Sequence, residues 1–101
     1  MSVLITVKVP GDVDIFTKSV HERGDDFAAV AERGKAAGAI HHQFGVGPDF
    51  ILVVDEWDAA EHFEAFFTAP DLQAFVGEVG GDTSVPPEIT VTTVIDSADK
   101  F

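Results

Sequence analysis

The hydrophobic pattern of this 101-residue chain switches between a two-residue and a 3.6-residue period in the order β-α-β-β-α-β. Hydrophobic residues make up 46% of the chain and charged residues 24%, a balance typical of a folded domain. At this length we expect a single domain over residues 1–101. Because β-α-β units cross over right-handed, both helices should lie on one face of a four-stranded antiparallel sheet. The predicted fold is therefore a ferredoxin-like α+β fold.

The N-terminal third predicts one strand and one long helix. Residues 3–9 place valine or isoleucine at every odd position, which indicates a half-buried strand ended by the turn residues 10–11. Apolar residues then recur every three or four positions, so an amphipathic helix should begin near Asp12 and end at Gly38. Gly24 lies inside that helix and predicts a kink.

The middle of the chain predicts an antiparallel hairpin and a second helix. Two apolar strands, 39–46 and 50–57, are separated by the turn-forming residues 47–49. Residues 58–61, Asp-Ala-Ala-Glu, have the spacing of a capping box, which predicts the start of the second helix. An apolar stripe continues past Pro70, a residue suited to a first helical position.

The C-terminal part completes the sheet and raises the question of its second face. A fourth strand is predicted at residues 89–95. The face away from the helices then carries apolar residues such as Leu4, Val94 and part of 50–54. Left in water, these residues would form a sizeable apolar patch. We therefore expect a homodimer in which two such sheets pack into an α+β barrel.

Charge and composition exclude several classes of function. Eighteen acidic residues against six basic ones give a net charge of −12, which argues against nucleic-acid or anionic-membrane partners. The chain has no cysteine, so disulfides, thiolate ligands and cysteine nucleophiles are excluded. The N-terminal apolar stretch is too short for a membrane span and lacks a cleavage site, which predicts a cytoplasmic protein. Without a phosphate-binding loop, a dinucleotide motif or a metal signature, we expect no cofactor and no metal.

Two adjacent histidines are the first candidates for chemistry. His41 and His42 lie on a strand, so their side chains point to opposite faces and at most one of them faces the helices. His42 shares parity with Ile40, Phe44 and Val46, the more apolar set, which places His42 in a pocket. A neutral imidazole is suited to act there as a general base, because the ordinary histidine pKa lies near physiological pH. The alternative is a hydrogen-bonded core or interface histidine.

Asp55 is the candidate partner of a histidine. It shares a strand face with Trp57, and a carboxylate in apolar surroundings is costly unless it is paired. A histidine on the neighbouring strand would be oriented by such a pair. A three-residue loop would set His41 opposite Asp55, whereas an even-length loop favours His42. The alternative is that Asp55 is only a polar strand end.

Aromatic residues and one arginine are the candidates for ligand binding. Trp57 is either a core aromatic or a stacking surface for a planar ligand. Arg23 falls on the inner stripe of the first helix; it either reaches solvent or pairs with a neighbouring acid, or it points into the pocket and anchors an anionic oxygen. Three phenylalanines are candidates for the pocket wall: Phe44, Phe63 and Phe66. Together these residues predict a site for a small hydrophobic ligand.

Residues 38–47, and residues 53–58 running into 63–67, resemble the dimeric α+β barrel superfamily and, within it, the antibiotic-biosynthesis monooxygenases. The resemblance covers nearly the whole chain and is greatest to small actinobacterial members. It implies a homodimer and a pocket between each sheet and its own helices. It does not imply one reaction, because such folds host many chemistries.

The resemblance also bears on single residues. Haem-degrading members use an Asn on the first strand, a Trp at the end of the third strand and an axial His late in the second helix. Trp57 matches the Trp, but Thr6 and Val7 stand in place of the Asn. Phe75 and Val76 occupy the region where the axial His is needed, so haem oxygenation is not expected.

The members that act on aromatic polyketides rely on Trp, Asn, Tyr and Arg around the substrate. Trp57 and Arg23 are the counterparts here, and the chain contains no Asn or Tyr. The resulting hypothesis is a cofactor-independent, monooxygenase-like or cyclase/isomerase-like enzyme for a small hydrophobic aromatic substrate, with a pocket histidine as base. The alternative is a non-catalytic ligand-binding or structural dimer. An open cavity that reaches a histidine favours enzyme or binder, and a core closed by side chains favours the structural dimer.

Overall fold

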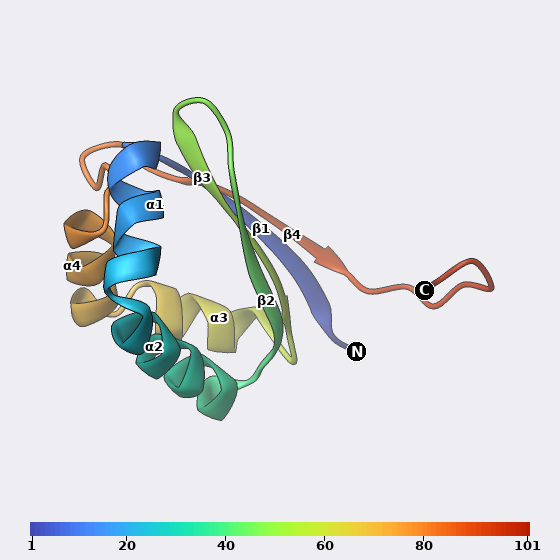
Figure 1. The fold of residues 1–101 in the computed structure, drawn as a ribbon. Helices are drawn as coiled ribbons and strands as arrows, with labels where there is room; N and C mark the ends of the chain where they lie inside the picture. Colours follow the sequence, from blue (N-terminus) through green and yellow to red (C-terminus); the bar gives the residue numbers. More distant parts are fainter.

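The computed structural model describes all 101 residues and confirms the ferredoxin-like α+β fold (Figure 1). The strands are β1 (Val3–Pro10), β2 (Ala39–Val46), β3 (Phe50–Trp57) and β4 (Glu88–Thr93). The helices are α1 (Val13–Glu22), α2 (Gly24–Ala37), α3 (Ala60–Phe67) and α4 (Pro70–Glu78). The strands form one antiparallel sheet in the order β2-β3-β1-β4. The helices lie on one side of this sheet and leave its other face bare.

The alternation in β1 sets the two faces of the sheet. Ile5, Val7 and Val9 are buried toward the helices, while the exposed residues of the strand lie on the bare face: Leu4, Thr6 and Lys8. This is the pattern that the sequence predicts for a half-buried strand. The buried residues join one core cluster with side chains from β3, α1, α3 and the end of α4: Phe16, Ile51, Trp57, Phe63 and Val79.

The predicted long helix is divided into α1 and α2. Asp12 caps α1, since its carboxylate accepts a hydrogen bond from the Ile15 amide at 3.0 Å. The backbone leaves the helical region at Arg23, with φ −116° and ψ 36°, and α2 begins at Gly24. The sequence predicts only a kink at this place. At its other end α2 stops at Gly38, whose φ of 126° favours glycine.

The predicted capping box at residues 58–61 is wrong. Ala59 precedes α3 with extended backbone and no side-chain cap, and the Asp58 carboxylate instead contacts His62 Nδ1 at 2.8 Å. Asp58 also donates its backbone N–H to the Gly38 carbonyl at 3.0 Å, which holds it against the end of α2. The second predicted helix is interrupted, and α4 begins at Pro70 in the way the sequence predicts.

The fourth strand ends sooner than predicted, at Thr93. The Val94 amide still donates to the Ser2 carbonyl at 3.0 Å, but β1 begins at Val3 and offers no further partner backbone. Ile95 therefore lies outside the strand and is exposed. The final residues run away from the body of the molecule (Figure 1). Among the helices, none has the length and apolar character needed to cross a membrane.

The glycines at the two ends of α2, Gly24 and Gly38, give a matched test of where this helix begins and ends. A Cβ at Gly38 would meet the Asp58 carboxylate in addition to straining a positive φ, whereas a Cβ at Gly24 meets nothing within 4 Å. Gly38→Ala should lower the free energy of unfolding by more than about 1 kcal/mol, and Gly24→Ala should leave it unchanged or raise it by up to about 1 kcal/mol. Urea denaturation followed by circular dichroism measures both. Equal effects would contradict the described ends of α2.

Candidate functional site

A cavity of about 560 Å³ lies between the sheet and the helices. Of its 25 lining residues, 20 are hydrophobic, and its size is that of a small-molecule site. The strands β1, β2 and β3 form its floor, and all four helices contribute to its walls. The sheet and helices therefore do not close completely on each other, in contrast to what a purely structural dimer requires.

The cavity opens between α2 and β2. The lining residues that are themselves exposed all belong to these two elements: Ala28, Lys35, Ile40, His41, His42 and Phe44. The lining residues of β1, β3, α3 and α4 are buried or half-buried. A ligand in this structure would thus pass between an edge strand and a single helix.

Three polar side chains meet at the floor of the cavity. Asp55 is only 7% exposed, and it is the one charged residue in the buried set. One carboxylate oxygen accepts the indole N–H of Trp57 at 3.0 Å, and the other lies 2.7 Å from His42 Nδ1. An ionised carboxylate can only accept, so Nδ1 carries the hydrogen and Nε2 keeps its lone pair. This arrangement leaves His42 able to take up a proton at Nε2.

The hairpin register brings these residues together. Val46 pairs with Ile51 at the turn, and counting back along both strands sets His42 directly opposite Asp55. Residues 47–50 thus form an even-length connection, which is the alternative that favours His42. A bulge near Ile40 interrupts the pairing only beyond this point.

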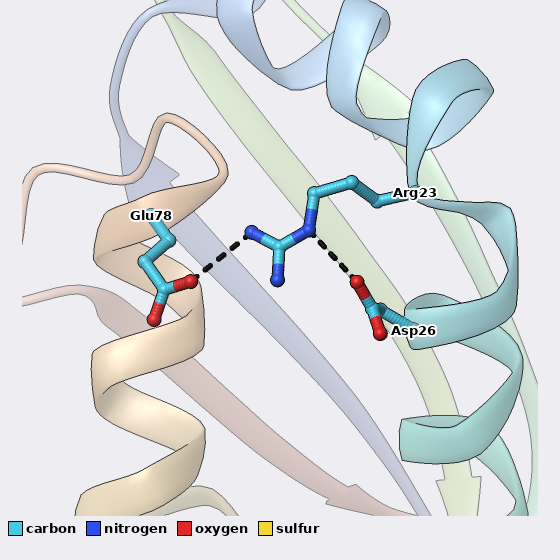
Figure 2. A network of polar contacts seen from close by, with 3 residues as sticks. All are labelled: Arg23, Asp26 and Glu78. Atoms are coloured by element: carbon cyan, nitrogen blue, oxygen red, sulfur yellow. Dashed lines mark hydrogen bonds and ion pairs between the residues drawn. The ribbon is translucent and has the colours of Figure 1, made fainter.

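His41 and Arg23 are not brought to the polar centre. His41 pairs with Glu56, a position on the bare face of the sheet, so it contacts the cavity only at its exposed mouth and does not reach Asp55. Arg23 does not line the cavity, because its guanidinium forms ion pairs with Asp26 at 2.9 Å and Glu78 at 3.1 Å (Figure 2). Hydrogen bonds first to Asp26 and then to Glu78 raise the pKa of Arg23 above its ordinary value.

The predicted aromatic residues surround the polar centre. Phe44 stands edge-on to the His42 ring, with centroids 4.5 Å apart. Trp57 is 1% exposed and lies against Phe63 and Phe66, at centroid distances of 5.7 Å and 5.4 Å. This burial matches the core alternative for Trp57. Its indole N–H positions Asp55, and the residue is also part of the cavity lining.

Phe27 lines the cavity and is not among the phenylalanines predicted for the pocket wall. Its ring makes edge contacts with Phe16 and Phe44 at 5.9 Å and with Phe75 at 5.1 Å. It thereby links α2 to α1, β2 and α4 around the cavity. Its place on the inner helical stripe is the signal in the sequence that indicates this position. No three histidine, aspartate or glutamate side chains gather closely enough to hold a metal ion.

Family models and curated protein sequences give no match to the chain, but solved structures do. The monooxygenase ActVA-Orf6 of Streptomyces coelicolor, solved in complex with nanaomycin D, matches with a TM-score of 0.68 at 16% identity and covers 99% of this chain and 93% of its own. SnoaB of Streptomyces nogalater, a cofactor-independent oxygenase, matches at 0.56 and 11% identity over 98% of both chains.

A dimeric ferredoxin-like protein from an uncultured marine organism matches with a TM-score of 0.62 at 17% identity, over 99% of this chain and 93% of its own. At these identities the likeness is one of fold. It confirms the predicted ferredoxin-like α+β fold.

The hydrogen bond between Trp57 and Asp55 has a measurable energetic signature. Trp57→Phe removes the donor and leaves a buried carboxylate oxygen unsatisfied, which should cost about 1–3 kcal/mol of unfolding free energy beyond the loss of ring volume. In a double-mutant cycle with Asp55→Ala, the two substitutions should therefore be non-additive by about 1 kcal/mol or more. Urea denaturation followed by circular dichroism gives all four values. Additive effects would count against the bond.

Proposed function

We propose that this chain is a cofactor-independent, monooxygenase-like or cyclase/isomerase-like enzyme that acts on a small hydrophobic aromatic substrate with His42 as its base. The observation that carries the proposal is the buried Asp55 that holds His42 Nδ1 at 2.7 Å beside an apolar cavity. A structural role alone would not require a titratable base at the edge of an open cavity. The neighbours described as a monooxygenase and a cofactor-independent oxygenase support this choice of reaction class.

The proposed first step is the transfer of a proton from the substrate to His42. Nε2 accepts a proton from an acidic C–H or O–H group, and the bonding electrons stay on the substrate as an enolate or phenolate. Asp55 remains ionised and stabilises the imidazolium that forms. The His42 side chain is 39% exposed, so it can return its proton to water at the mouth of the cavity.

The character of the cavity suits a flat, apolar and uncharged substrate. Its walls are mainly phenylalanine, valine and alanine; both arginine side chains lie outside it, and the one cation of the lining, Lys35, is exposed at the mouth and paired with Glu32. The substrate anion can therefore form only where an aromatic system delocalises the charge. In the oxygenation branch, dioxygen is the co-substrate: a CH₂ group becomes C=O, and the second oxygen atom leaves as water. In the cyclase or isomerase branch, the anion reacts within the substrate.

Deuterium exchange tests the proton transfer whichever branch follows. In D₂O without oxygen, the protein should accelerate exchange at the acidic CH₂ group of anthrone or 2-tetralone, measured by NMR. His42→Ala should reduce that acceleration by about 10²-fold or more, and Asp55→Asn should reduce it as well. His21→Ala is the matched control and should exchange like the wild type, because His21 is exposed on α1 and does not line the cavity.

Two results would count against an enzyme. No acceleration, together with a change in the fluorescence of Trp57 on adding anthrone, would identify a non-catalytic binding protein; Trp57 is the one tryptophan and the chain has no tyrosine. Acceleration that survives His42→Ala but is lost in His41→Ala would show that the base is His41, and the proposed role of His42 would be wrong.

We also propose that the chain forms a homodimer through the bare face of its sheet. Leu4 pairs with Glu56 and lies beside β4, and its side chain is 46% exposed. Leu52 and Val54 of β3 belong to the same face, with Val54 also exposed. An uncovered apolar sheet face is unfavourable in water, and a second copy covers it with a matching surface. The neighbour described as dimeric supports the same arrangement.

A charge on the bare face should break the dimer. Native mass spectrometry of the wild type should give twice the chain mass of 10.8 kDa, and Leu4→Lys should give the single-chain mass because it buries an unpaired charge. Ile15→Lys is the matched control: Ile15 is 48% exposed but lies on α1, and this variant should remain dimeric. A dimer that tolerates Leu4→Lys would contradict the proposed interface.

A further inference from the structure

Both arginines of the chain connect α2 to α4. Arg23 precedes α2 and pairs with Glu78 at the end of α4, at 3.1 Å. Arg33, near the other end of α2, pairs with Asp71 in the first turn of α4, at 2.7 Å. Figure 2 shows the Arg23 guanidinium between the end of α1 and α4. We call these two ion pairs the arginine clasps.

Each clasp also lies on the wall of the cavity. The Arg23 guanidinium is 5.0 Å from the centre of the Phe75 ring, and that of Arg33 is 5.9 Å from the centre of the Phe66 ring. Both phenylalanines line the cavity on the side of α3 and α4. The clasps therefore tie α2 to the opposite wall from outside, and neither arginine occupies ligand space.

Apart from the clasps, α2 has few buried contacts. Gly34 is its one buried residue and lies close to Ala39 of β2 and Phe66 of α3, while several inward residues of the helix line the cavity. A second apolar link is the ring of Phe27, which contacts three other phenylalanines. The helix is bounded by Gly24, which follows a non-helical residue, and by Gly38 with its positive φ. Such ends allow the backbone to turn without moving the sheet.

The charge of the molecule opposes the closed position of α2. The chain carries a net charge of −12, and the carboxylates that the clasps hold stand on both sides of the seam: Asp26 on α2, and Asp71 and Glu78 on α4. Without the two guanidinium groups these carboxylates repel each other. The clasp side chains are between one third and two thirds exposed, and exposed ion pairs are weak and screened by salt. The clasps can therefore open and close readily.

We infer that α2 is a movable wall of the cavity and that the arginine clasps hold it closed over a bound ligand. The exposed part of the cavity lining lies on α2 and β2, so an outward movement of α2 widens the opening through which a ligand passes. This inference rests on the proposed function only in that the cavity takes a ligand; it does not depend on the chemistry of His42.

Removing both clasps should speed the exchange of a ligand. The probe is the neutral dye N-phenyl-1-naphthylamine, whose dissociation is followed by stopped-flow fluorescence. The double variant Arg23→Gln/Arg33→Gln should release it about three- to tenfold faster at low salt. Salt at about 1 M should raise the wild-type rate toward the low-salt rate of the variant, and it should not raise the rate of the variant, in which only repulsion between carboxylates is left to screen. Lys18→Gln/Lys100→Gln changes the net charge equally but touches neither α2 nor α4, and should behave as the wild type.

A covalent clasp should have the opposite effect. The chain has no cysteine, so Arg23→Cys/Glu78→Cys can be joined by a short bis-maleimide linker without other reaction sites. The linked protein should release the dye at least about tenfold more slowly than the unlinked variant. Release that is unaffected by the linker would overturn the inference.

Amide hydrogen exchange tests the same movement without a ligand. Amides of α2 should exchange faster in Arg23→Gln/Arg33→Gln than in the wild type, while amides of β1 and β3 stay unchanged. Equal protection of α2 in both proteins would show a fixed wall and overturn the inference, even if the dye does not bind. The effects of His42→Ala on deuterium exchange of a ketone test the proposed function separately, because that variant leaves both clasps intact.

Discussion

The buried carboxylate of Asp55 is the constraint on which the site depends. A charge with this little contact with water is tolerated only if its oxygens are satisfied. Trp57 serves one oxygen and His42 the other, and the two donors come from β3 itself and from the neighbouring strand β2. The hairpin register, the orientation of the imidazole and the burial of the tryptophan are therefore parts of one arrangement. A shift of the register by one residue would leave the charge unpaired.

Around this centre the sheet and the helices are packed incompletely, and the space between them is an open cavity. The core cluster extends from β1 to Trp57, Phe63 and Val79, whereas α2 contributes only partly buried residues to its edge, such as Phe27 and Ala37. The side chains of α2, together with Phe66 and Phe75, form one wall of the cavity. Edge contacts between phenylalanine rings and two ion pairs at the surface hold this wall in place. A rigid polar floor and a loosely attached wall suit a site that must orient a base and still admit a ligand.

The sequence predicts what short-range patterns determine. The alternation of apolar residues in 3–9 indicates which face of β1 is buried. His42 and Phe44 are two residues apart on one strand, which correctly places both side chains on the face toward the helices. The pairing of His42 with Asp55 stays open at that stage, because it depends on whether the turn holds three or four residues, and Phe50 can end the turn or begin the strand. The capping box fails because Asp58 has stronger partners in His62 and the end of α2. The ion pair between Arg23 and Glu78 joins residues 55 positions apart, for which no local pattern exists.

The most direct test of this account is the tautomer of His42, measured by ¹⁵N NMR of the imidazole at a pH where the ring is neutral. Hydrogen on Nδ1, with Nε2 free, is the result that the account predicts, and Asp55→Asn should disturb it while His41→Ala should not. Hydrogen on Nε2 in the wild type would contradict the account, because Nδ1 would then offer a lone pair to Asp55 and the base would have no free nitrogen facing the cavity.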